Sequence, residues 1–224
     1  KVERKNRKEK PPLLYDLTTL QREANKLLGY TAQQTLDYTQ SLYEKKMVTY
    51  PRTDSRYLTE DMAAMIPELV QKTAKKLSFS DETVPVRTGQ VINNKKVTDH
   101  HAIIPTKTAA ETDLSALPAG ERAVLELIAR RLVCAVGIPC ESDETAVELS
   151  CADAVFKAKG SIVTEPGWKA FISGAESRKE DKEEDALLIP DIQNGMELTV
   201  SEAACKEGKT VPPKHYTEAT LLQA

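Results

Sequence analysis

Several signatures of familiar site chemistries are missing from this chain of 224 residues. Its nine glycines form neither GxGxxG nor GxxxxGK[ST], the loops that cradle nucleotide phosphates. No GxSxG elbow offers a serine nucleophile, and neither HExxH, DxDxD nor clustered Cys and His residues offer a metal site. The sequence therefore gives no support to nucleotide hydrolysis, serine-hydrolase chemistry or metal binding.

Cysteine is scarce, and long apolar runs are absent. The four cysteines include no CxxC pair, so we expect reduced thiols rather than a zinc site or disulfides. No apolar run approaches the ~18 residues that a membrane span requires. The charged start KVERKNRKEK has no apolar stretch behind it and does not resemble a secretory signal. We therefore expect a soluble, cytoplasmic protein with no membrane partner.

Neither sign of charge is in large excess. Lys and Arg number 31 and Asp and Glu 34, a net charge of -3. A protein that binds nucleic acid through bulk charge alone is strongly basic, so any DNA contact must be local. Apolar residues at 40% and charged residues at 29% are typical of a globular protein. Because the chain starts without Met and stops at TLLQA inside an expected helix, we expect a piece of a longer protein.

Two adjacent helices are predicted after a basic segment at 1–10, itself expected to be a linker or a strand end. Apolar residues recur with helical spacing over 17–28, and Gly29 follows as a left-handed cap. Thr31 and Gln34 fit a capping box that opens the second helix. The pair fits a winged-helix or helix-turn-helix module, although plain packing of two amphipathic helices is commoner. The expected apolar face of the second helix comprises Leu36, Thr39, Leu42, Tyr43 and Met47.

The next segment is expected to be extended, because Pro51 keeps Tyr50 out of helical geometry at a strand end or in a loop. A third helix is predicted from Thr59 to about Leu77, with Pro67 as a break or kink. Residues 78–98 are expected to form a loop and a hairpin that turns at the Asn93-Asn94 pair.

Helix gives way to strand in the second half of the chain. A strongly apolar helix is predicted from about Glu121 to Val136. Beyond Pro139, apolar and polar residues alternate as in strands, which marks a domain boundary and an α+β protein. An acidic stretch at 176–185 is expected to be an exposed loop, and a last helix begins near Thr217. The alternation is found at 145–150, 154–158 and 196–200.

Reactive polar side chains gather in two short segments, TYPRTDSRY at 49–57 and TDHHAIIPT at 98–106. Tyr50 is a candidate nucleophile toward a phosphodiester if cations favour its phenolate, because a phenol with a pKa of about 10 is otherwise weak. In an extended segment residues i and i+2 point to the same side, so Tyr50 and Arg52 can converge on one phosphate. His100 can donate a proton to a nonbridging or leaving oxygen.

Other residues of the first segment have supporting or structural explanations. Arg56 is a second candidate phosphate contact, whereas Thr53, Asp54 and Ser55 can fix an arginine or cap the following helix. Taken singly, a Tyr before a Pro is ordinarily packing, an Arg beside an Asp is ordinarily a surface ion pair, and a His is ordinarily a satisfied polar residue.

The order of the motifs is more specific than any single residue. TYPRTDSRYL after the helix pair, then DHHAIIPT, then PPKHYTEATLLQA closely resemble the type IA DNA topoisomerases, particularly the bacterial topoisomerase III branch. By this resemblance Tyr50 is the nucleophile that forms a transient 5′-phosphotyrosine and frees a 3′-hydroxyl, Arg52 contacts the scissile phosphate, and His100 assists. His215 departs from the family, where arginine is common, which puts a role for that position in doubt. The implied DNA contacts are Arg56, Thr53, Asp54, Thr18, Gln21 and Thr217.

The resemblance also implies an architecture. The fold would be a multidomain α+β one, in which a mainly α-helical, winged-helix-like catalytic-tyrosine domain is inserted in a β-rich arch. A hinge at the two crossings between these domains would let a strand pass. The implied divisions are 1–14 as a strand end or linker of the arch, 15–138 as the tyrosine domain, 139–205 as the arch, and 206–224 as the start of a helical domain that binds single-stranded DNA.

The same family implies a cofactor and partners. Type IA enzymes hold Mg²⁺ on an acidic cluster, beside a catalytic lysine, in an N-terminal TOPRIM domain, and no such cluster occurs here. We therefore expect no metal ligand in this chain, a Mg²⁺ requirement in the full-length enzyme, no ATP, and no activity of this fragment alone. The expected enzyme is a monomer in the cytoplasm at the nucleoid, and it relaxes or decatenates DNA through single-stranded segments.

Three other classes fit less well. Tyrosine recombinases need an RHR set with Tyr near the C-terminus, and relaxases need a His-apolar-His pair, but Tyr50 comes early and His100-His101 are adjacent. A non-catalytic winged-helix module at 15–58 would need a basic recognition helix, whereas the second helix carries Asp37 and Glu44. A purely structural subunit would leave Tyr50 and Arg52 unexplained.

Overall fold

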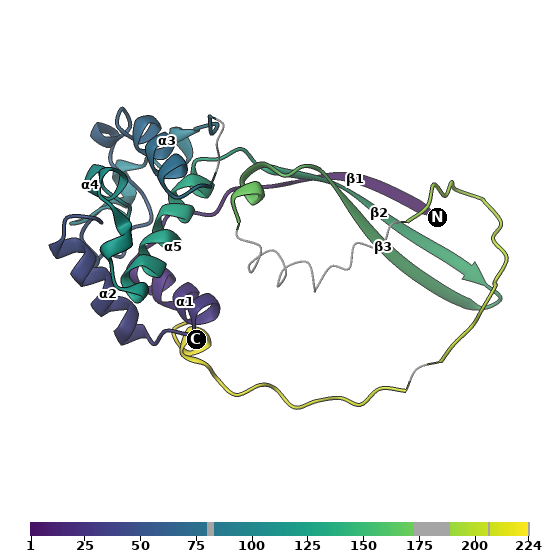
Figure 1. The fold of residues 1–224 in the computed structure, drawn as a ribbon. Coiled ribbons are helices and arrows are strands. Elements are labelled where there is room, and N and C mark those ends of the chain that lie inside the picture. Colours follow the sequence, from purple (N-terminus) through teal and green to yellow (C-terminus); the bar gives the residue numbers. More distant parts are fainter. Residues whose placement is uncertain (80–82, 173–188, 206, 224) are drawn as a thin grey trace.

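The computed structural model describes residues 1–79, 83–172, 189–205 and 207–223. A body of helices lies at one end, and a long β ribbon projects from it (Figure 1). The helices of the body are α1 (Leu17–Leu28), α2 (Ala32–Glu44), α3 (Ile66–Lys76), α4 (Lys107–Glu111) and α5 (Ala119–Ala135). The ribbon consists of β1 (Val2–Glu9), β2 (Cys140–Cys151) and β3 (Ala154–Glu165).

The ribbon is a three-stranded antiparallel sheet in the order β1-β2-β3. β1 precedes the helical body in sequence and β2 follows it, and the two strands pair from Val2 opposite Val147 to Glu9 opposite Cys140. Pairs of opposite charge across the two strands favour this register: Arg7 lies 2.8 Å from Glu144, and Lys8 lies 2.7 Å from Glu141. The basic segment at the N-terminus is therefore a strand that pairs with an acidic one.

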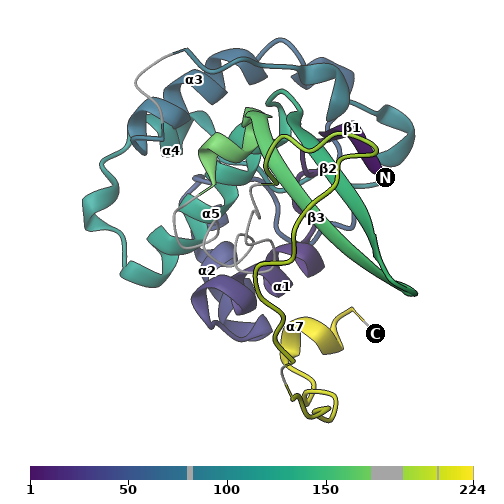
Figure 2. The same ribbon diagram turned by 90° about the vertical axis from the view of Figure 1, so that its right-hand side faces the viewer.

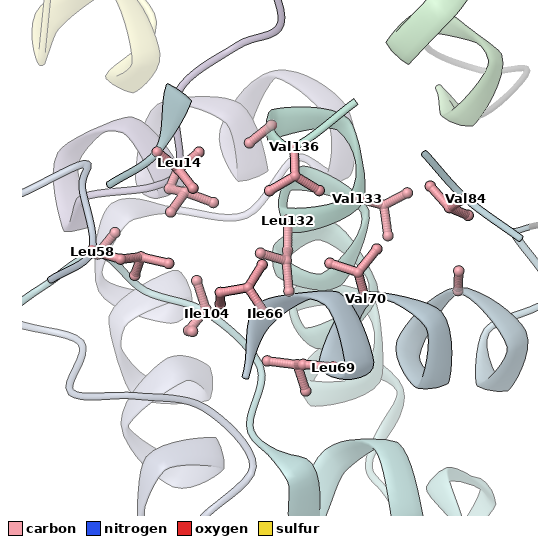
Figure 3. Close-up of a cluster of buried hydrophobic side chains, with 14 residues drawn as sticks. Leu14, Leu58, Ile66, Leu69, Val70, Val84, Ile104, Leu132, Val133 and Val136 are labelled. Atoms are coloured by element: carbon pink, nitrogen blue, oxygen red, sulfur yellow. The ribbon is translucent and has the colours of Figure 1, made fainter. Parts of the chain in front are cut away.

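Helix α5 runs through the middle of the body and buries side chains on more than one face. Its C-terminal half packs against α3 and the segments around Leu14, Leu58 and Ile104 (Figure 3). Its N-terminal half packs against Leu20 of α1 and Leu42 of α2 in a second cluster. Because both faces of α5 are buried, its sequence is apolar on more than one face instead of showing a single apolar stripe.

The N-terminal helix pair is as predicted. α1 ends at Gly29, whose φ of 73° is left-handed, and α2 opens with the capping box between Thr31 and Gln34. The predicted face of α2 is only partly correct: Thr35, Thr39 and Leu42 are buried, but Tyr43 is 39% exposed. The fourth predicted helix corresponds to α5, and α7 (Glu218–Leu221) begins after its cap Thr217 as predicted.

The predicted helical stretch from Thr59 to about Leu77, with a break or kink at Pro67, is partly correct: both of its ends are found, but it is two helices and the interruption comes before Pro67. A 3₁₀ helix η1 (Glu60–Met62) comes first, and α3 starts at Ile66 with Pro67 in its first turn. Proline is tolerated there because the first N–H groups of a helix have no intrahelical acceptor. Pro67 therefore lies in the first turn of α3 and does not kink the helix.

The predicted hairpin in 78–98 is also absent from the part of that range the structure describes. Two 3₁₀ helices, η2 (Thr88–Gln90) and η3 (Asn94–Lys96), occupy it, and Ile92 forms an isolated parallel bridge with Leu58. The Asn93 side chain accepts from the backbone N–H of Lys95, so it caps η3 rather than turning a hairpin.

The third predicted strand, at 196–200, is wrong as well. Its residues form no regular structure, and the side chains of Met196, Leu198 and Val200 are exposed. The predicted acidic loop at 176–185 lies outside the described residues. The division into four domains and the winged-helix likeness stay predictions.

The end of the described chain returns to the body. Residues 191–194 contact β1 through the Arg4–Asp191 ion pair (2.6 Å) and the bond from the Val2 N–H to Asn194 (2.6 Å). The chain then runs back from the distal end of the ribbon, and α7 lies against α1 (Figures 1 and 2). Among the described residues, no helix is long and apolar enough to cross a membrane.

Candidate active site

The end of α2 sets the direction of the chain that carries Tyr50. The N–H of Lys46 donates to the carbonyl of Tyr43 (2.8 Å) and that of Met47 to the carbonyl of Leu42 (2.8 Å). These two bonds form a Schellman motif, which needs a left-handed residue, and Lys46 supplies it with a φ of 59°. The chain therefore reverses past the last turn of α2, and Tyr50 follows three residues after Met47.

Hydrogen bonds hold the two reactive segments side by side. The N–H of Thr49 donates to the carbonyl of Ile104 (3.0 Å), and the hydroxyl of Thr49 accepts from the N–H of Ile104 (3.0 Å) and donates to the carbonyl of Ala102 (3.0 Å). Val48 also forms an isolated bridge with Pro105. TYPRTDSRY and DHHAIIPT, separated in sequence, are therefore one structural unit.

Side chains alternate in burial along the first segment. Pro51, Thr53 and Ser55 are buried, whereas Arg52 and Asp54 are exposed and Tyr50 is half-buried. The backbone is not fully extended, because it bends at Pro51 and Arg52 and the N–H of Thr53 donates to the carbonyl of Pro51 (3.1 Å). The Arg52 and Asp54 side chains are exposed close to Tyr50 in the sequence.

The ring of Tyr50 contacts two other rings. The ring of His100 is 4.3 Å away between centroids and tilted by 44°, and the ring of Tyr43 is 5.4 Å away in an edge-to-face arrangement of 78°. His100 is exposed, so its ring nitrogens remain accessible to a substrate. The structure therefore brings together Tyr50 and His100, which the sequence places in different segments.

Thr53 connects the segment of Tyr50 to the segment of His100. Its hydroxyl donates to the carbonyl of His100 (2.9 Å) and accepts from the N–H of Ser55 (3.1 Å). Its side chain is almost fully buried, with 8% of the residue exposed. Thr98 makes a second link, since its hydroxyl donates to the carboxylate of Asp54 (3.2 Å). Both predicted DNA contacts, Thr53 and Asp54, thus have internal partners.

The other predicted residues are spread more widely. Arg52 makes no hydrogen bond or ion pair within the described part of the chain, whereas the Nε of Arg56 donates to the carbonyl of Leu14 (3.0 Å). On α1, Thr18 is exposed, and the amide of Gln21 donates to the carbonyl of Ala32 (3.0 Å). Thr217 caps α7. Arg52 is therefore the predicted arginine left available to a ligand beside Tyr50.

The remaining tyrosines lack this setting. Tyr15 is fully buried, its hydroxyl accepts from Arg131 (3.2 Å), and burial raises its pKa well above the ordinary value. Tyr30 and Tyr38 pack on each other with centroids 5.3 Å apart, and the hydroxyl of Tyr57 accepts from a lysine. None of these lies against a histidine ring within the described residues.

No metal centre is formed by the described ranges: they contain no group of three or more His, Cys, Asp or Glu side chains that could hold an ion. The described residues around Tyr50 therefore provide no such set of ligands for Mg²⁺.

A cavity of about 1010 Å³ lies between α1, α5, α7 and the 3₁₀ helix η5 (Gly167–Phe171). Sequence reasoning did not find it, because its lining comes from segments far apart in the chain. Arginines and lysines outnumber acidic residues in the lining, so the cavity favours an anion. The charged residues are Arg22, Lys26, Arg130, Arg131 and Lys214 against Glu23.

Comparisons with known proteins agree with these features. The family model described as DNA topoisomerase matches residues 1–224. DNA topoisomerase 3 of Shouchella clausii is 40% identical over 235 residues, covering 100% of this chain and 31% of that protein. DNA topoisomerase 3 of Bacillus subtilis is 37% identical over 220 residues, covering 95% and 30%. The chain thus spans under a third of the length of these relatives.

Among solved structures, full-length topoisomerase I from Thermotoga maritima is similar to the whole chain. The TM-score is 0.61 at 21% sequence identity, and the match covers 36% of that protein. At this identity the likeness concerns the fold.

Proposed function

We propose, since the chain belongs to the DNA topoisomerase family, that it is part of a type IA enzyme in which Tyr50 cleaves and rejoins a DNA strand. The ring contact between Tyr50 and His100, beside the available side chain of Arg52, is the observation that carries this proposal. We propose that Tyr50 is the nucleophile, His100 the proton donor and Arg52 the cation that meets the phosphate charge.

The proposed step is a phosphoryl transfer from one oxygen to another. The phenol oxygen of Tyr50 attacks the phosphorus and forms a 5′-phosphotyrosine, while the bond from phosphorus to the 3′-oxygen breaks. The phenol releases its proton to solvent, and the departing 3′-oxygen takes one up, for which we propose His100 as the donor. Religation reverses both bond changes, so no ATP is consumed.

Arg52 is proposed to stabilise the negative charge of the phosphate. The charge on the nonbridging oxygens can be met by a guanidinium, which forms paired hydrogen bonds to phosphate. Since Arg52 is exposed and has no partner in the described residues, ligand binding breaks no existing contact. Arg56, whose Nε is bonded to the Leu14 carbonyl, is the less available of the two arginines.

Single-stranded DNA is the proposed partner. The excess of basic residues around the cavity between α1, α5 and α7 supports binding of a polyanion although the whole chain is slightly acidic. Because the described residues offer no metal centre, we propose that the Mg²⁺ of the reaction is held outside this chain and that the chain alone is inactive. We further propose that the full-length enzyme is monomeric and passes a strand by moving the tyrosine domain relative to the arch.

A covalent-adduct assay tests the nucleophile. The full-length enzyme is incubated with a single-stranded oligonucleotide labelled at its 3′ end, and a denaturing gel shows whether label migrates with protein. We expect an adduct in the wild type and none in Tyr50→Phe, with oligonucleotide binding retained. Tyr57→Phe is the matched control and keeps the adduct. A labelled adduct that persists in Tyr50→Phe would place the nucleophile elsewhere.

The alternative function is a non-catalytic DNA-binding module built on α1 and α2. Adjacent helices of this kind support it, but the acidic residues Asp37 and Glu44 on α2 do not. It predicts tight, sequence-dependent binding of duplex DNA without an adduct, and the same enzyme sample in a duplex-binding titration distinguishes the two.

A further inference from the structure

Tyr43 is the second aromatic neighbour of Tyr50, beside His100. Its ring meets that of Tyr50 edge to face, with centroids 5.4 Å apart and planes at 78°. This arrangement is a favourable one for aromatic pairs, because the electropositive edge of one ring faces the electronegative face of the other. Tyr50 is thus bounded by Tyr43 from α2 and by His100 from the second reactive segment.

Tyr43 is carried by a firmly held turn. Two neighbours in the last turn of α2 bond to one buried carboxylate: the hydroxyl of Ser41 (2.9 Å) and the Nζ of Lys45 (2.5 Å) both donate to Glu121 of α5. Glu121 is only 7% exposed, whereas Lys45 is itself exposed, so the carboxylate is buried and its two bonds are partly buried. The Schellman motif adds the bond from the Lys46 N–H to the Tyr43 carbonyl.

The Tyr43 side chain contributes little to the core. It is 39% exposed and belongs to neither of the two buried clusters of the helical body. Its hydroxyl has no hydrogen-bond partner within the described residues. The main contact that its ring makes with another aromatic ring is the one with Tyr50, which makes a purely structural role a poor explanation.

We propose that Tyr43 is a positioning residue whose ring fixes the orientation of the Tyr50 phenol for attack on phosphorus. The phenol oxygen lies on the ring axis, so rotation about that axis does not move it, and the χ1 rotamer of Tyr50 sets where it points. A neighbouring ring held on a rigid turn favours one such rotamer, and misplacement of a nucleophile lowers the rate without weakening substrate binding. This inference rests on the proposed function of Tyr50.

Two substitutions separate the ring from the hydroxyl. Tyr43→Phe keeps the aromatic ring and removes only the hydroxyl, whereas Tyr43→Leu replaces the ring with a shorter apolar side chain. In the full-length enzyme we expect single-turnover cleavage of a labelled oligonucleotide to fall on the order of 10–100-fold in Tyr43→Leu, with Kd changed less than about 2-fold. Tyr43→Phe should cleave within about 2-fold of the wild type.

The matched control is Tyr30→Leu, which removes a similar edge-to-face pair, with Tyr38 at 5.3 Å and 65°. It should leave the cleavage rate unchanged. An NMR spectrum of the protein with labelled tyrosine rings gives a readout independent of activity: the Tyr50 ring signals should shift in Tyr43→Leu, and much less in Tyr43→Phe, since a ring current is lost only in the former.

The outcomes are distinct. Wild-type cleavage by Tyr43→Leu, or an equal loss in Tyr43→Phe, overturns the positioning role. A rise in Kd that accounts for the whole loss in Tyr43→Leu also overturns it, because Tyr43 would then bind DNA directly. If Tyr50→Phe still forms an adduct, the proposed function itself fails, whatever Tyr43 does.

Discussion

At the scale of single residues, Thr53 shows how one buried hydroxyl can join two segments. It bonds to the His100 carbonyl and to the Ser55 N–H, so it holds the loop of the proposed proton donor against the segment of the proposed nucleophile. Buried hydrogen bonds of this kind gain little when made but cost much when one partner is removed.

Thr53→Val removes both bonds and leaves the shape almost unchanged. We expect the free energy of unfolding to fall by about 1–3 kcal/mol, because the Ser55 N–H and the His100 carbonyl lose their partner. Thr53→Ser keeps the hydroxyl and should lose less than about 1 kcal/mol, roughly the value of one buried methyl group. Urea denaturation of both variants measures the difference, and equal stabilities would contradict the argument.

Substitution of Arg52 and of Arg56 should have opposite effects on stability and on adduct formation. Arg52→Ala should change the unfolding free energy by less than about 0.5 kcal/mol, since Arg52 is exposed and has no described partner, but should strongly lower adduct formation. Arg56→Ala should lose about 1 kcal/mol of stability through its bond to the Leu14 carbonyl and affect adduct formation less. A denaturation curve and an adduct assay on each variant compare them; a larger stability loss in Arg52→Ala would favour a packing role.

At the scale of elements, the ends of α1 and α2 use the left-handed region with different residues. Gly29 has a φ of 73° and Lys46 a φ of 59°. Glycine populates this region without steric cost, whereas a side chain costs roughly 1–2 kcal/mol there. The second helix thus ends in a less favourable residue, on the turn that leads to Tyr50.

Exchanging the residue types should change stability in opposite directions. Lys46→Gly should raise the unfolding free energy by up to about 1 kcal/mol, because the strain at φ 59° is relieved. Gly29→Ala should lower it by about 1 kcal/mol through backbone strain alone, since an added Cβ meets no atom within 4 Å. Thermal unfolding of the two variants provides the measurement, and a destabilised Lys46→Gly would show that its side chain contributes instead.

Elements were predictable from sequence where local signals agreed. Periodicity and caps gave α1, α2 and α5, because Gly29 and the Thr31–Gln34 box act within one or two turns. The alternation at 196–200 was misleading, because a strand also needs a partner with free backbone groups. The Asn93-Asn94 pair could not distinguish a hairpin from the cap of η3, since both use the same asparagine chemistry.

The candidate site was only partly predictable. The sequence correctly predicted that Tyr50 lies outside a helix, but the segment bends at Pro51 and Arg52. The convergence of Tyr50 and Arg52 on one phosphate stays a prediction. The approach of His100 to Tyr50 depends on hydrogen bonds between distant segments, so periodicity could not give it, and it came from the family resemblance. Tyr43 was assigned to the buried face of α2 because helical spacing cannot tell a core position from one beside a site.

At the scale of the whole molecule, Trp168 connects the ribbon to the helical body. Its indole N–H donates to the carbonyl of Glu9 at the end of β1 (3.3 Å), and its backbone N–H donates to that of Ile138 before β2 (2.9 Å). It packs with Cys134 of α5 and Cys140 of β2 and is 8% exposed. One side chain therefore contacts both strands where they leave the body.

Trp168→Ala should loosen this junction. We expect a loss of about 3–5 kcal/mol in unfolding free energy from the cavity it leaves, together with faster amide hydrogen exchange at the ends of β1 and β2 that lie at the body. Trp168→Phe keeps most of the apolar contact and should lose much less. Exchange that increases equally along α1 would instead indicate a global loss of stability.

The pairing of β1 with β2, which are far apart in the sequence, affects folding during translation. The residue opposite Glu9 is Cys140, and the one opposite Val2 is Val147, so during translation β1 leaves the ribosome long before its partner exists. An unpaired strand edge is a template for aggregation unless charges protect it. The β1 sequence VERKNRKE contains a single apolar residue. The unpaired strand is therefore well solvated, and it does not aggregate before the acidic residues of β2 have been synthesised and can pair with it.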